Sequence, residues 1–378
     1  KYRGRDVIPL WIADMDFPVA PVIEAALAAH VRHGNYGYTA VPRDLPGLLV
    51  DDHEQRYGWP VDPEWIVWLP GLVLGLNLAV KTCCGPDEQA ISFSPVYPPF
   101  LGAPAQQGRG LIDLPLLPLN AAQTDFAIDF AGLEAAVGAA AAQGRPARLL
   151  LLCHPHNPIG RAFRRDELDL LAAFCQRHEL YVCSDEVHCD LILDGTTRHV
   201  PFATVIQELS PALLARTITL HSPSKTDNTA GIGLAWALIP DPALRRRFRA
   251  ASQRLVPEPS CFGFTALRAI FEGGEPWRQA LLSQLRDNRD LASAALDRMG
   301  LAHTHPQATY LSWVDARALT AEVGNAASFF EHHGVGLSDG ADFGCPGFLR
   351  LNFAAPPSLL ATALERMANA LANALATR

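Results

Sequence analysis

Lysine is scarce in this chain of 378 residues. Only Lys1, Lys81 and Lys225 stand among 31 basic side chains, and the other 28 are arginines. The net charge of -8 argues against non-specific binding of nucleic acid, which is a polyanion. No apolar run approaches the roughly 18 residues that a membrane span needs, and no signal peptide opens the chain. We therefore expect a soluble, cytoplasmic protein that binds neither nucleic acid nor membrane.

The chain also lacks cysteines in the spacing of a zinc knuckle. Most of its eight cysteines lie inside apolar runs, such as Leu149 to Cys153, where a thiol behaves as a small core residue in a reducing compartment. Cys183 and Cys189 flank His188, which leaves a metal site conceivable, but the pattern matches no known zinc spacing. We predict no bound metal.

The order of apolar and polar runs predicts an α/β fold. Between residues 89 and 238 short β-type runs alternate with helical ones, which is typical of a parallel sheet with crossover helices. The clearest unit has a strand at Leu149 to Cys153, a helix at Arg165 to His178 and a strand at Leu180 to Ser184. Internal repeats are absent.

The length of the chain and a change of texture near residue 265 predict two domains. A single core seldom grows beyond about 300 residues. After residue 265 the helices become longer and amphipathic, as at Leu281 to Met299, and a β-rich segment follows. We predict a large domain over residues 41–265 and a smaller α+β domain over 266–378, with residues 1–40 packing on the small domain and on a partner subunit.

Polar residues follow three of the predicted strands. Asn157 comes after the first strand, Asp185 ends the second, and Ser222-Pro-Ser-Lys225 follows the strand from Arg216 to His221. Strand topology brings such positions to one edge of a parallel sheet, where α/β proteins bind their ligands. Lys225 could there form a Schiff base with a carbonyl cofactor. The alternative for each residue alone is a solvated loop.

These residues meet the requirements of pyridoxal phosphate. Asp185 can keep the pyridine nitrogen protonated, Asn157 can donate to the phenolic oxygen, and Tyr97 can stack on the ring. Arg350, in a β-type run, suits the carboxylate of an α-amino acid. The phosphate needs backbone amides at a helix N-terminus and hydroxyl groups, for which the candidates are Gly71, Leu72, Val73, Ser222 and Ser224.

Taken together, the motifs resemble those of fold-type I pyridoxal-phosphate enzymes, and within them the cystathionine β-lyase-like C-S lyases grouped with class I/II aminotransferases. The resemblance covers nearly the whole chain. It rests on these segments: Trp11-Ile-Ala-Asp-Met-Asp-Phe17, Tyr36-Gly-Tyr-Thr39, Pro95-Val-Tyr-Pro-Pro-Phe100, His154-Pro-His-Asn-Pro-Ile-Gly-Arg161, Ser184-Asp-Glu-Val-His188, Ser222-Pro-Ser-Lys-Thr-Asp-Asn228 and Arg350-Leu-Asn-Phe353.

The resemblance implies an aspartate aminotransferase-like fold, with a mostly parallel seven-stranded sheet in the large domain, and a homodimer. It makes Lys225 the lysine that binds the cofactor, with Asp185, Asn157 and Tyr97 around the ring. It also implies that Arg350 and Ala13 bind the substrate, and that Tyr38 crosses the dimer interface to the phosphate and substrate of the other subunit.

Three features depart from the resembled families. Asp227 stands where these lyases usually carry an aromatic residue, so we expect a carboxylate close to the cofactor. Gly233 stands where many aminotransferases carry a phosphate-binding arginine. The lyase-like subgroup also lacks this arginine, so the glycine favours a lyase. The chain begins close to the first family block, so an N-terminal stretch preceding Lys1 is expected in the native protein.

The resemblance predicts a carbon-sulfur β-lyase that releases pyruvate, ammonia and a thiol from cystathionine or a related S-substituted cysteine. Lys225 would act as the general base at the α-carbon. The first alternative is a pyridoxal-phosphate-dependent aminotransferase. The second, of another class, is a regulatory protein that binds the cofactor without turnover.

Overall fold

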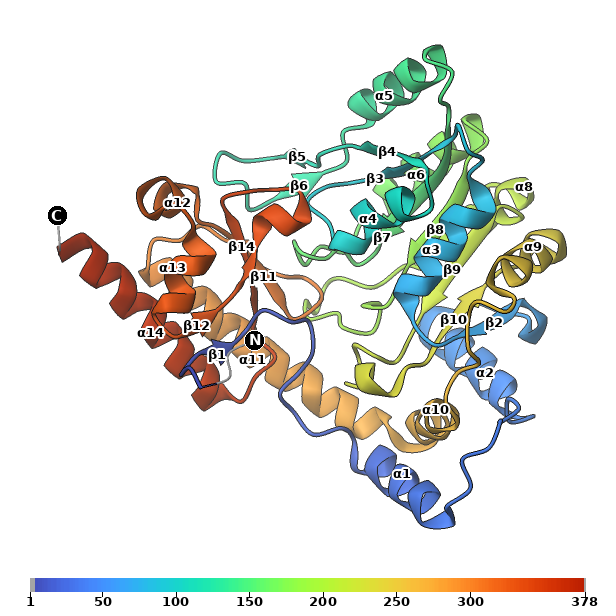
Figure 1. The fold of residues 1–378 in the computed structure, drawn as a ribbon, viewed down its shortest axis with the longest axis horizontal. Helices are drawn as coiled ribbons and strands as arrows, with labels where there is room; N and C mark the ends of the chain where they lie inside the picture. The colour runs from blue at the N-terminus through green and yellow to red at the C-terminus, as the bar shows by residue number, and fades with distance from the viewer. Residues whose placement is uncertain (1–3, 377–378) are drawn as a thin grey trace.

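A seven-stranded sheet forms the centre of the structure, a computed structural model that describes residues 4–376 (Figure 1). The strand order is β2-β10-β9-β8-β7-β3-β4, and β10 runs antiparallel to both of its neighbours while the other pairs are parallel. The predicted mostly parallel sheet is therefore confirmed. Its strands are β2 (Ile66–Leu69), β3 (Gln89–Ser92), β4 (Gly110–Asp113), β7 (Ala147–Cys153), β8 (Tyr181–Asp185), β9 (Thr217–His221) and β10 (Ala235–Leu238).

Helices cover both faces of this sheet, which explains why its strands carry apolar side chains on both faces. In β7, Leu149 and Leu151 belong to one hydrophobic core, whereas Leu150 and Leu152 belong to the core on the opposite face. The first core includes side chains of α3 (Leu72–Cys83), α4 (Pro98–Gln106) and α9 (Pro242–Ser252). The second includes side chains of α5 (Phe130–Ala142), α6 (Arg165–Arg177), α7 (Phe202–Leu209) and α8 (Pro211–Leu214).

A smaller antiparallel sheet lies in the C-terminal part of the chain. Its order is β11-β14-β13, with β11 at Leu311–Asp315, β14 at Phe348–Asn352 and β13 at Ser338–Asp339. The long helix α11 (Glu275–Arg298) runs from α10 (Cys261–Gly273) toward this sheet and α14 (Pro357–Ala376), as Figure 1 shows. The two short helices of this part are α12 (Arg317–Val323) and α13 (Ala326–His332).

The N-terminal segment joins the C-terminal part before it reaches the large sheet. β1 (Ile8–Pro9) pairs in parallel with β12 (Val335–Gly336), and the Ile8 and Leu10 side chains enter the core that α11 and α14 share. Helix α1 (Pro21–His33) begins at a proline and has Gly34 as its C-cap, and α2 (Leu45–Tyr57) follows. The remaining short strands are β5 (Leu117–Pro118) and β6 (Phe126–Ala127).

The division into residues 41–265 and 266–378 remains our proposal. The pairing of β1 with β12 supports the proposed packing of the N-terminal segment on the small domain. Of that segment, residues 1–3 lie outside the described residues.

Candidate active site

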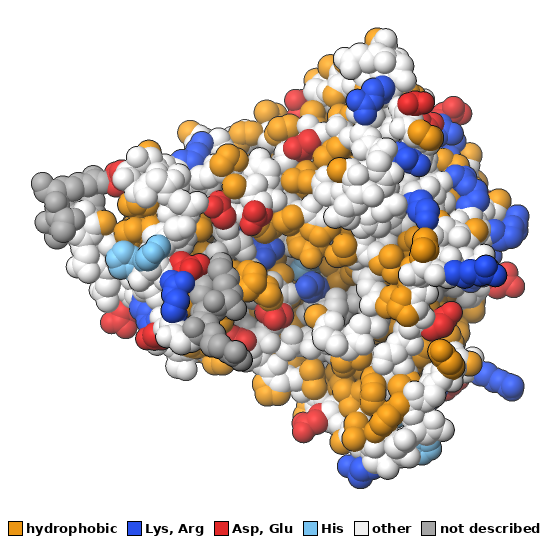
Figure 2. Space-filling view, viewed as in Figure 1, with side chains coloured by type: hydrophobic (Ala, Val, Ile, Leu, Met, Phe, Trp, Pro, Cys, Tyr) orange, Lys and Arg blue, Asp and Glu red, His pale blue; other side chains and the backbone are white. Residues whose placement is uncertain are grey.

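A cavity of about 950 Å³ lies where the carboxyl ends of β7, β8 and β9 meet. Asn157, Asp185 and Lys225, which follow or end these three strands, all line it. Figure 2 shows a hollow near the middle of this face, with basic side chains at its centre and hydrophobic side chains around it. The expected convergence of the three strand ends is therefore present in the structure.

The Lys225 side chain reaches into this cavity from the loop after β9. Its Nζ atom donates a hydrogen bond to the carbonyl oxygen of Ala13 at 2.7 Å. Burial lowers the pKa of the Lys225 amine, and the Arg350 guanidinium lowers it further. The loop is held by Ser222, whose Oγ donates to the carbonyl of Leu234 at 2.7 Å and accepts from the backbone N–H of Ser224 at 3.1 Å. The amine is thus both positioned and easier to deprotonate.

Asp185 is the last residue of β8 and is almost completely buried. Burial raises the pKa of its carboxyl group to about 7. Its Oδ1 accepts one hydrogen bond, from the backbone N–H of Val187 at 3.1 Å, and the described residues place no ion-pair partner on it. A cationic ring nitrogen in the cavity would supply the missing counter-charge and favour the carboxylate.

Arg350 enters the cavity from β14 and is 5% exposed. Its Nη1 donates to Oδ1 of Asn157 at 3.0 Å, and its Nη2 donates to the carbonyl of Trp11 at 2.7 Å. The amide nitrogen of Asn157 is thereby turned away from Arg350 and can serve as a donor. The Nε atom of Arg350 is buried and has no hydrogen-bond partner among residues 4–376, which suits the binding of an additional anionic group.

The remaining predicted cofactor residues, with the exception of Tyr38, also line the cavity. Gly71 is the N-cap of α3, so the backbone N–H groups of Leu72 and Val73 lie at a helix N-terminus, where a phosphate binds well. Tyr97 and Ser224 lie on the same lining. Ser222 lines it too, but its hydroxyl proton is already donated to Leu234, so Ser224 is the better hydroxyl donor of the two.

Tyr38 lies elsewhere and fully exposed, in a surface hollow that His30 and Thr265 also line. It does not reach the cavity of its own chain. Its predicted role in the site of a second subunit stays a prediction.

The expectation that Asp227 lies close to the cofactor was wrong. Asp227 does not line the main cavity; its side chain, 5% exposed, faces a second polar region on the other side of the loop. Burial, followed by the nearby Asp190 carboxylate, raises the pKa of Asp227 to about 8. The reason is local geometry: residues 225 and 227 leave the same loop in different directions.

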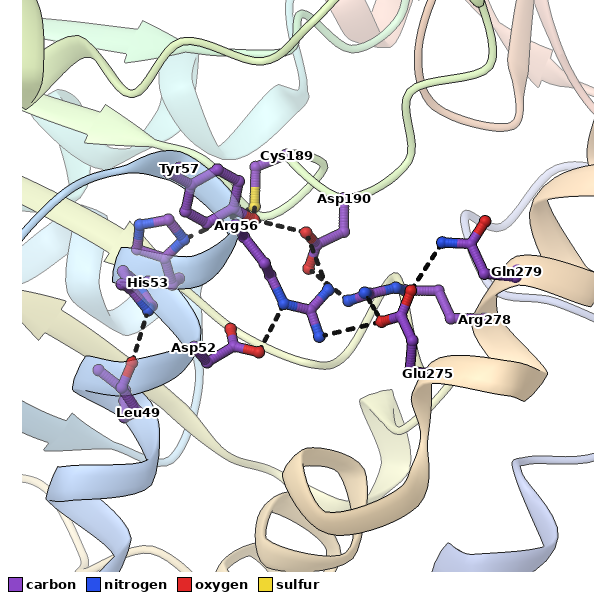
Figure 3. A network of polar contacts seen from close by, with 11 residues as sticks. Leu49, Asp52, His53, Arg56, Tyr57, Cys189, Asp190, Glu275, Arg278 and Gln279 are labelled. Carbon is purple, nitrogen blue, oxygen red and sulfur yellow. Dashed lines mark hydrogen bonds and ion pairs between the residues drawn. The ribbon is translucent and has the colours of Figure 1, made fainter.

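We call that second region the Arg56 cluster, and Figure 3 shows it. It joins α2 and the N-terminus of α11 to the loop after β8. Nε of Arg56 lies 2.5 Å from Oδ1 of Asp52, and Nη1 lies 3.4 Å from Oδ1 of Asp190. Arg278 approaches Oδ2 of Asp190 at 3.6 Å and also pairs with Glu275. Asp190 therefore lies between two arginines.

Comparison with known proteins decides the family. The sequence profile of the family named aminotransferase class I and II matches residues 5–367. Cystathionine beta-lyase PatB of Bacillus subtilis (strain 168) is 34% identical, over 97% of this chain and 93% of its own length. This chain belongs to the aminotransferase class I and II family.

Two solved structures of similar fold support the family assignment. The crystal structure of OvoB superposes with a TM-score of 0.91 at 42% identity, covering 98% of this chain and 94% of that one. The PLP-bound C-S lyase from Staphylococcus hominis has a TM-score of 0.88 at 28% identity, with 97% and 92% covered. The predicted family and fold are thus confirmed.

In this member of the aminotransferase class I and II family, the site includes three residues that sequence reasoning did not select. His188 lines the cavity, and its Nδ1 is buried without a partner. Tyr310 donates to the same Ala13 carbonyl as Lys225, at 2.9 Å. Asn228 binds the segment that carries Ala13. His188 and Asn228 lie inside quoted motifs, but nothing in the sequence marked Tyr310.

Three polar side chains of the cavity fit pyridoxal phosphate. Among the described residues, the Asp185 carboxylate has no charged partner, and Nδ1 of His188 and Nε of Arg350 have no hydrogen bond. Within residues 4–376, no group of three or more His, Cys, Asp or Glu side chains could hold a metal ion. None of the described helices is long and apolar enough to cross a membrane.

Proposed function

We propose that this protein is a pyridoxal-phosphate-dependent carbon-sulfur β-lyase. It would cleave cystathionine or a related S-substituted cysteine to pyruvate, ammonia and a thiol. The observation that carries the proposal is the meeting of the Lys225 amine, the Asp185 carboxylate and the Arg350 guanidinium in one cavity. The names of PatB and of the Staphylococcus hominis C-S lyase support a lyase over an aminotransferase.

The residues of the cavity divide the work of the reaction. Bound pyridoxal phosphate would draw electrons away from the substrate α-carbon. Arg350 would bind the α-carboxylate, and Lys225, with its lowered pKa, would take the α-proton as a general base. Loss of that proton and of the thiolate from the β-carbon leaves aminoacrylate, which water converts to pyruvate and ammonia.

The other predicted residues would hold the cofactor. Asp185 would face the pyridine nitrogen, Asn157 would donate to the phenolic oxygen, and Tyr97 would lie on the ring. Leu72, Val73 and Ser224 would donate to the phosphate, with Gly71 and Ser222 shaping the loops that carry them. Ala13 would lie beside the substrate.

We further propose a cytoplasmic homodimer in which Tyr38 reaches the phosphate and substrate of the second subunit. The exposure of Tyr36, Tyr38 and Val31 on one region of the surface supports a protein contact there.

The test is incubation with L-cystathionine and with S-alkylcysteines, measuring pyruvate and free thiol together. Equal amounts of the two products are expected. Formation of a keto acid only when a second keto acid is added, without thiol, would favour the aminotransferase instead. Binding of the cofactor with turnover of neither substrate type would favour a regulatory protein.

Lys225→Ala should lower the rate by at least about 1,000-fold and remove the visible absorbance of the lysine-bound cofactor. Lys81→Ala is the matched control, because Lys81 is exposed and its Nζ bonds only to the carbonyl of Ala251 on the surface of the large domain. If Lys225→Ala kept the rate of the parent or this visible absorbance, Lys225 would not be the lysine that binds the cofactor.

A further inference from the structure

The segment Trp11–Phe17, which we call the strap, crosses the cavity without forming a helix or a strand. Side chains make most of the hydrogen bonds that hold it, and the backbone N–H of Asp16 also donates to the carbonyl of Ala354 at 3.0 Å. Nδ2 of Asn352 donates to the carbonyls of Ile12 at 2.6 Å and Asp14 at 2.7 Å. Arg350 donates to the carbonyl of Trp11 at 2.7 Å. One end of the strap is therefore bound to β14, which also carries the proposed substrate arginine.

The other end of the strap is bound to the loop of Lys225. Asn228, three residues after Lys225, donates from Nδ2 to the carbonyls of Met15 at 2.9 Å and Phe17 at 2.8 Å. Its Oδ1 accepts from the backbone N–H of Met15 at 3.2 Å. Asn228 has a φ of 53°, a left-handed conformation that asparagine tolerates better than most residues. The amide thus ties the strap to the catalytic loop.

The middle of the strap meets the Lys225 amine itself. The carbonyl oxygen of Ala13 accepts from Nζ of Lys225 at 2.7 Å and from Oη of Tyr310 at 2.9 Å. A carbonyl oxygen has two lone pairs, so these donors fill its capacity. Tyr310 is completely buried, and its hydroxyl has this carbonyl as its acceptor. The hydroxyl lies against the carbonyl that holds the amine and does not line the cavity.

We propose that Tyr310 is a positioning residue for Lys225 and acts through the carbonyl of Ala13. The Tyr310 hydroxyl fixes the carbonyl where the Lys225 amine rests whenever that amine is not bonded to the cofactor. Because the two donors share one acceptor, the hydroxyl also weakens the hold of the carbonyl on a protonated amine, and this eases release of the proton. Asn228 keeps the strap in register with the Lys225 loop.

The first test needs no catalysis. In the full chain stripped of cofactor, the pH dependence of labelling by an amine-reactive reagent is measured at Lys225 by mass spectrometry of its peptide, with Lys81 as the internal control. In Tyr310→Phe the Ala13 carbonyl is left to Lys225 alone and favours the ammonium form. The labelling midpoint of Lys225 should rise by about half a pH unit, or about threefold in proton affinity, with Lys81 unchanged.

The second test uses the holoenzyme and rests on the proposed lyase function. In Tyr310→Phe, kcat should fall by about tenfold while KM stays within about twofold, because the base is misplaced but Arg350 is intact. Tyr181→Phe is the matched control, since the Tyr181 hydroxyl accepts from Arg247 at the opposite end of β8. A structural role alone would lower thermal stability without moving the labelling midpoint.

Asn228→Gly provides a second variant that keeps the left-handed backbone and removes the amide. It should also lower kcat, and its effect combined with Tyr310→Phe should be smaller than the product of the two, because Tyr310 bonds to the Ala13 carbonyl and Asn228 holds the strap that carries this carbonyl. An unchanged Lys225 midpoint in a folded Tyr310→Phe, or fully multiplicative effects of the two variants, would overturn the proposal. If the parent protein cleaves no substrate, the lyase proposal fails, while the labelling midpoint still decides the role of Tyr310.

Discussion

Two segments of this protein, the end of β8 with the loop after it and the loop after β9, each contribute residues to both the cavity and the Arg56 cluster. The end of β8 gives Asp185 to the cavity, and the loop after β8 gives Asp190 to the cluster. The loop after β9 gives Lys225 to the cavity and Asp227 to the lining of the cluster. The two regions are therefore opposite sides of the same chain segments, yet their charges are arranged differently.

In the cluster most charges are paired, whereas two charged groups of the cavity, Asp185 and Lys225, have no ion pair within residues 4–376. Asp190 lies between Arg56 and Arg278. Among the described residues, Asp185 and Lys225 hydrogen-bond to backbone groups alone. Burial raises the pKa of Asp185 and lowers the pKa of Lys225, and both shifts favour the neutral form of the side chain. Buried groups without counter-ions lower stability but are ready for chemistry or for a charged ligand, while paired groups hold elements together. This difference in charge pairing distinguishes the cavity, a candidate reaction site, from the Arg56 cluster, which holds the surrounding elements together.

Among the variants of the cavity that keep Lys225, Arg350→Ala should show the largest effect. Removing one partner of a desolvated charge pair costs about 2 to 5 kcal/mol, or roughly 30- to several-thousand-fold in kcat/KM. The loss should appear mainly as a higher KM, with a smaller loss of cofactor affinity because Arg350 also orients Asn157. Arg286→Ala, on α11, is a control for the loss of an arginine. An unchanged KM would remove Arg350 from the substrate site.

Local patterns in the sequence were sufficient for the fold and for most of the cavity. The predicted strand Leu149 to Cys153 and helix Arg165 to His178 agree with β7 and α6 to within two residues, because apolar runs and helix ends are local signals. The rule that ligands bind at the carboxyl ends of parallel strands brought Asn157, Asp185 and Lys225 together correctly.

The features that the sequence could not predict depend on the orientation of side chains and on contacts between residues far apart in the chain. Whether Asp227 points into the cavity or away from it is decided by the backbone of one loop. The contact of Tyr310 with Ala13 joins residues 297 positions apart, through a backbone oxygen that has no sequence signature. The contact of Arg56 with Asp190 likewise joins α2 to a loop far along the chain. Tertiary packing, rather than local preference, determines these contacts.

Arg56→Met should break the cluster while leaving the chemistry of the cavity in place. Arg56 is 16% exposed and Asp190 23%, so the loss of the arginine should lower the free energy of unfolding by about 2 kcal/mol. We expect kcat/KM at 25 °C to change by less than about threefold, because Arg56 does not line the cavity. Chemical denaturation of the parent and the variant measures the first effect. A large loss of kcat at unchanged stability would show that the cluster takes part in catalysis.

Asp227→Asn tests how pH changes the contribution to stability of one buried carboxyl group that lines the cluster. The pKa of Asp227 is raised to about 8 in the folded protein, so between about pH 4 and pH 8 the folded state keeps a proton that the unfolded state has lost. The stability of the parent should therefore fall, relative to Asp227→Asn, by about 1 kcal/mol per pH unit as the pH rises through this window. The two proteins should be equally stable below it.

Without cofactor, the stability of the parent should also fall relative to Asp185→Asn as the pH rises toward 7, because burial raises the pKa of Asp185 to about 7 in the folded protein. The two carboxyl groups should differ when the cofactor is added. A positive ring nitrogen facing Asp185 would remove the loss of stability that this carboxyl group causes as the pH rises. Asp227 lies outside the cavity, so the loss of stability that it causes should remain. Denaturation at several pH values, with and without cofactor and with the exposed Asp87→Asn as control, separates them. If cofactor binding abolished the pH dependence caused by Asp227, this carboxyl group would belong to the cavity after all, and the contrast between the two regions would fail.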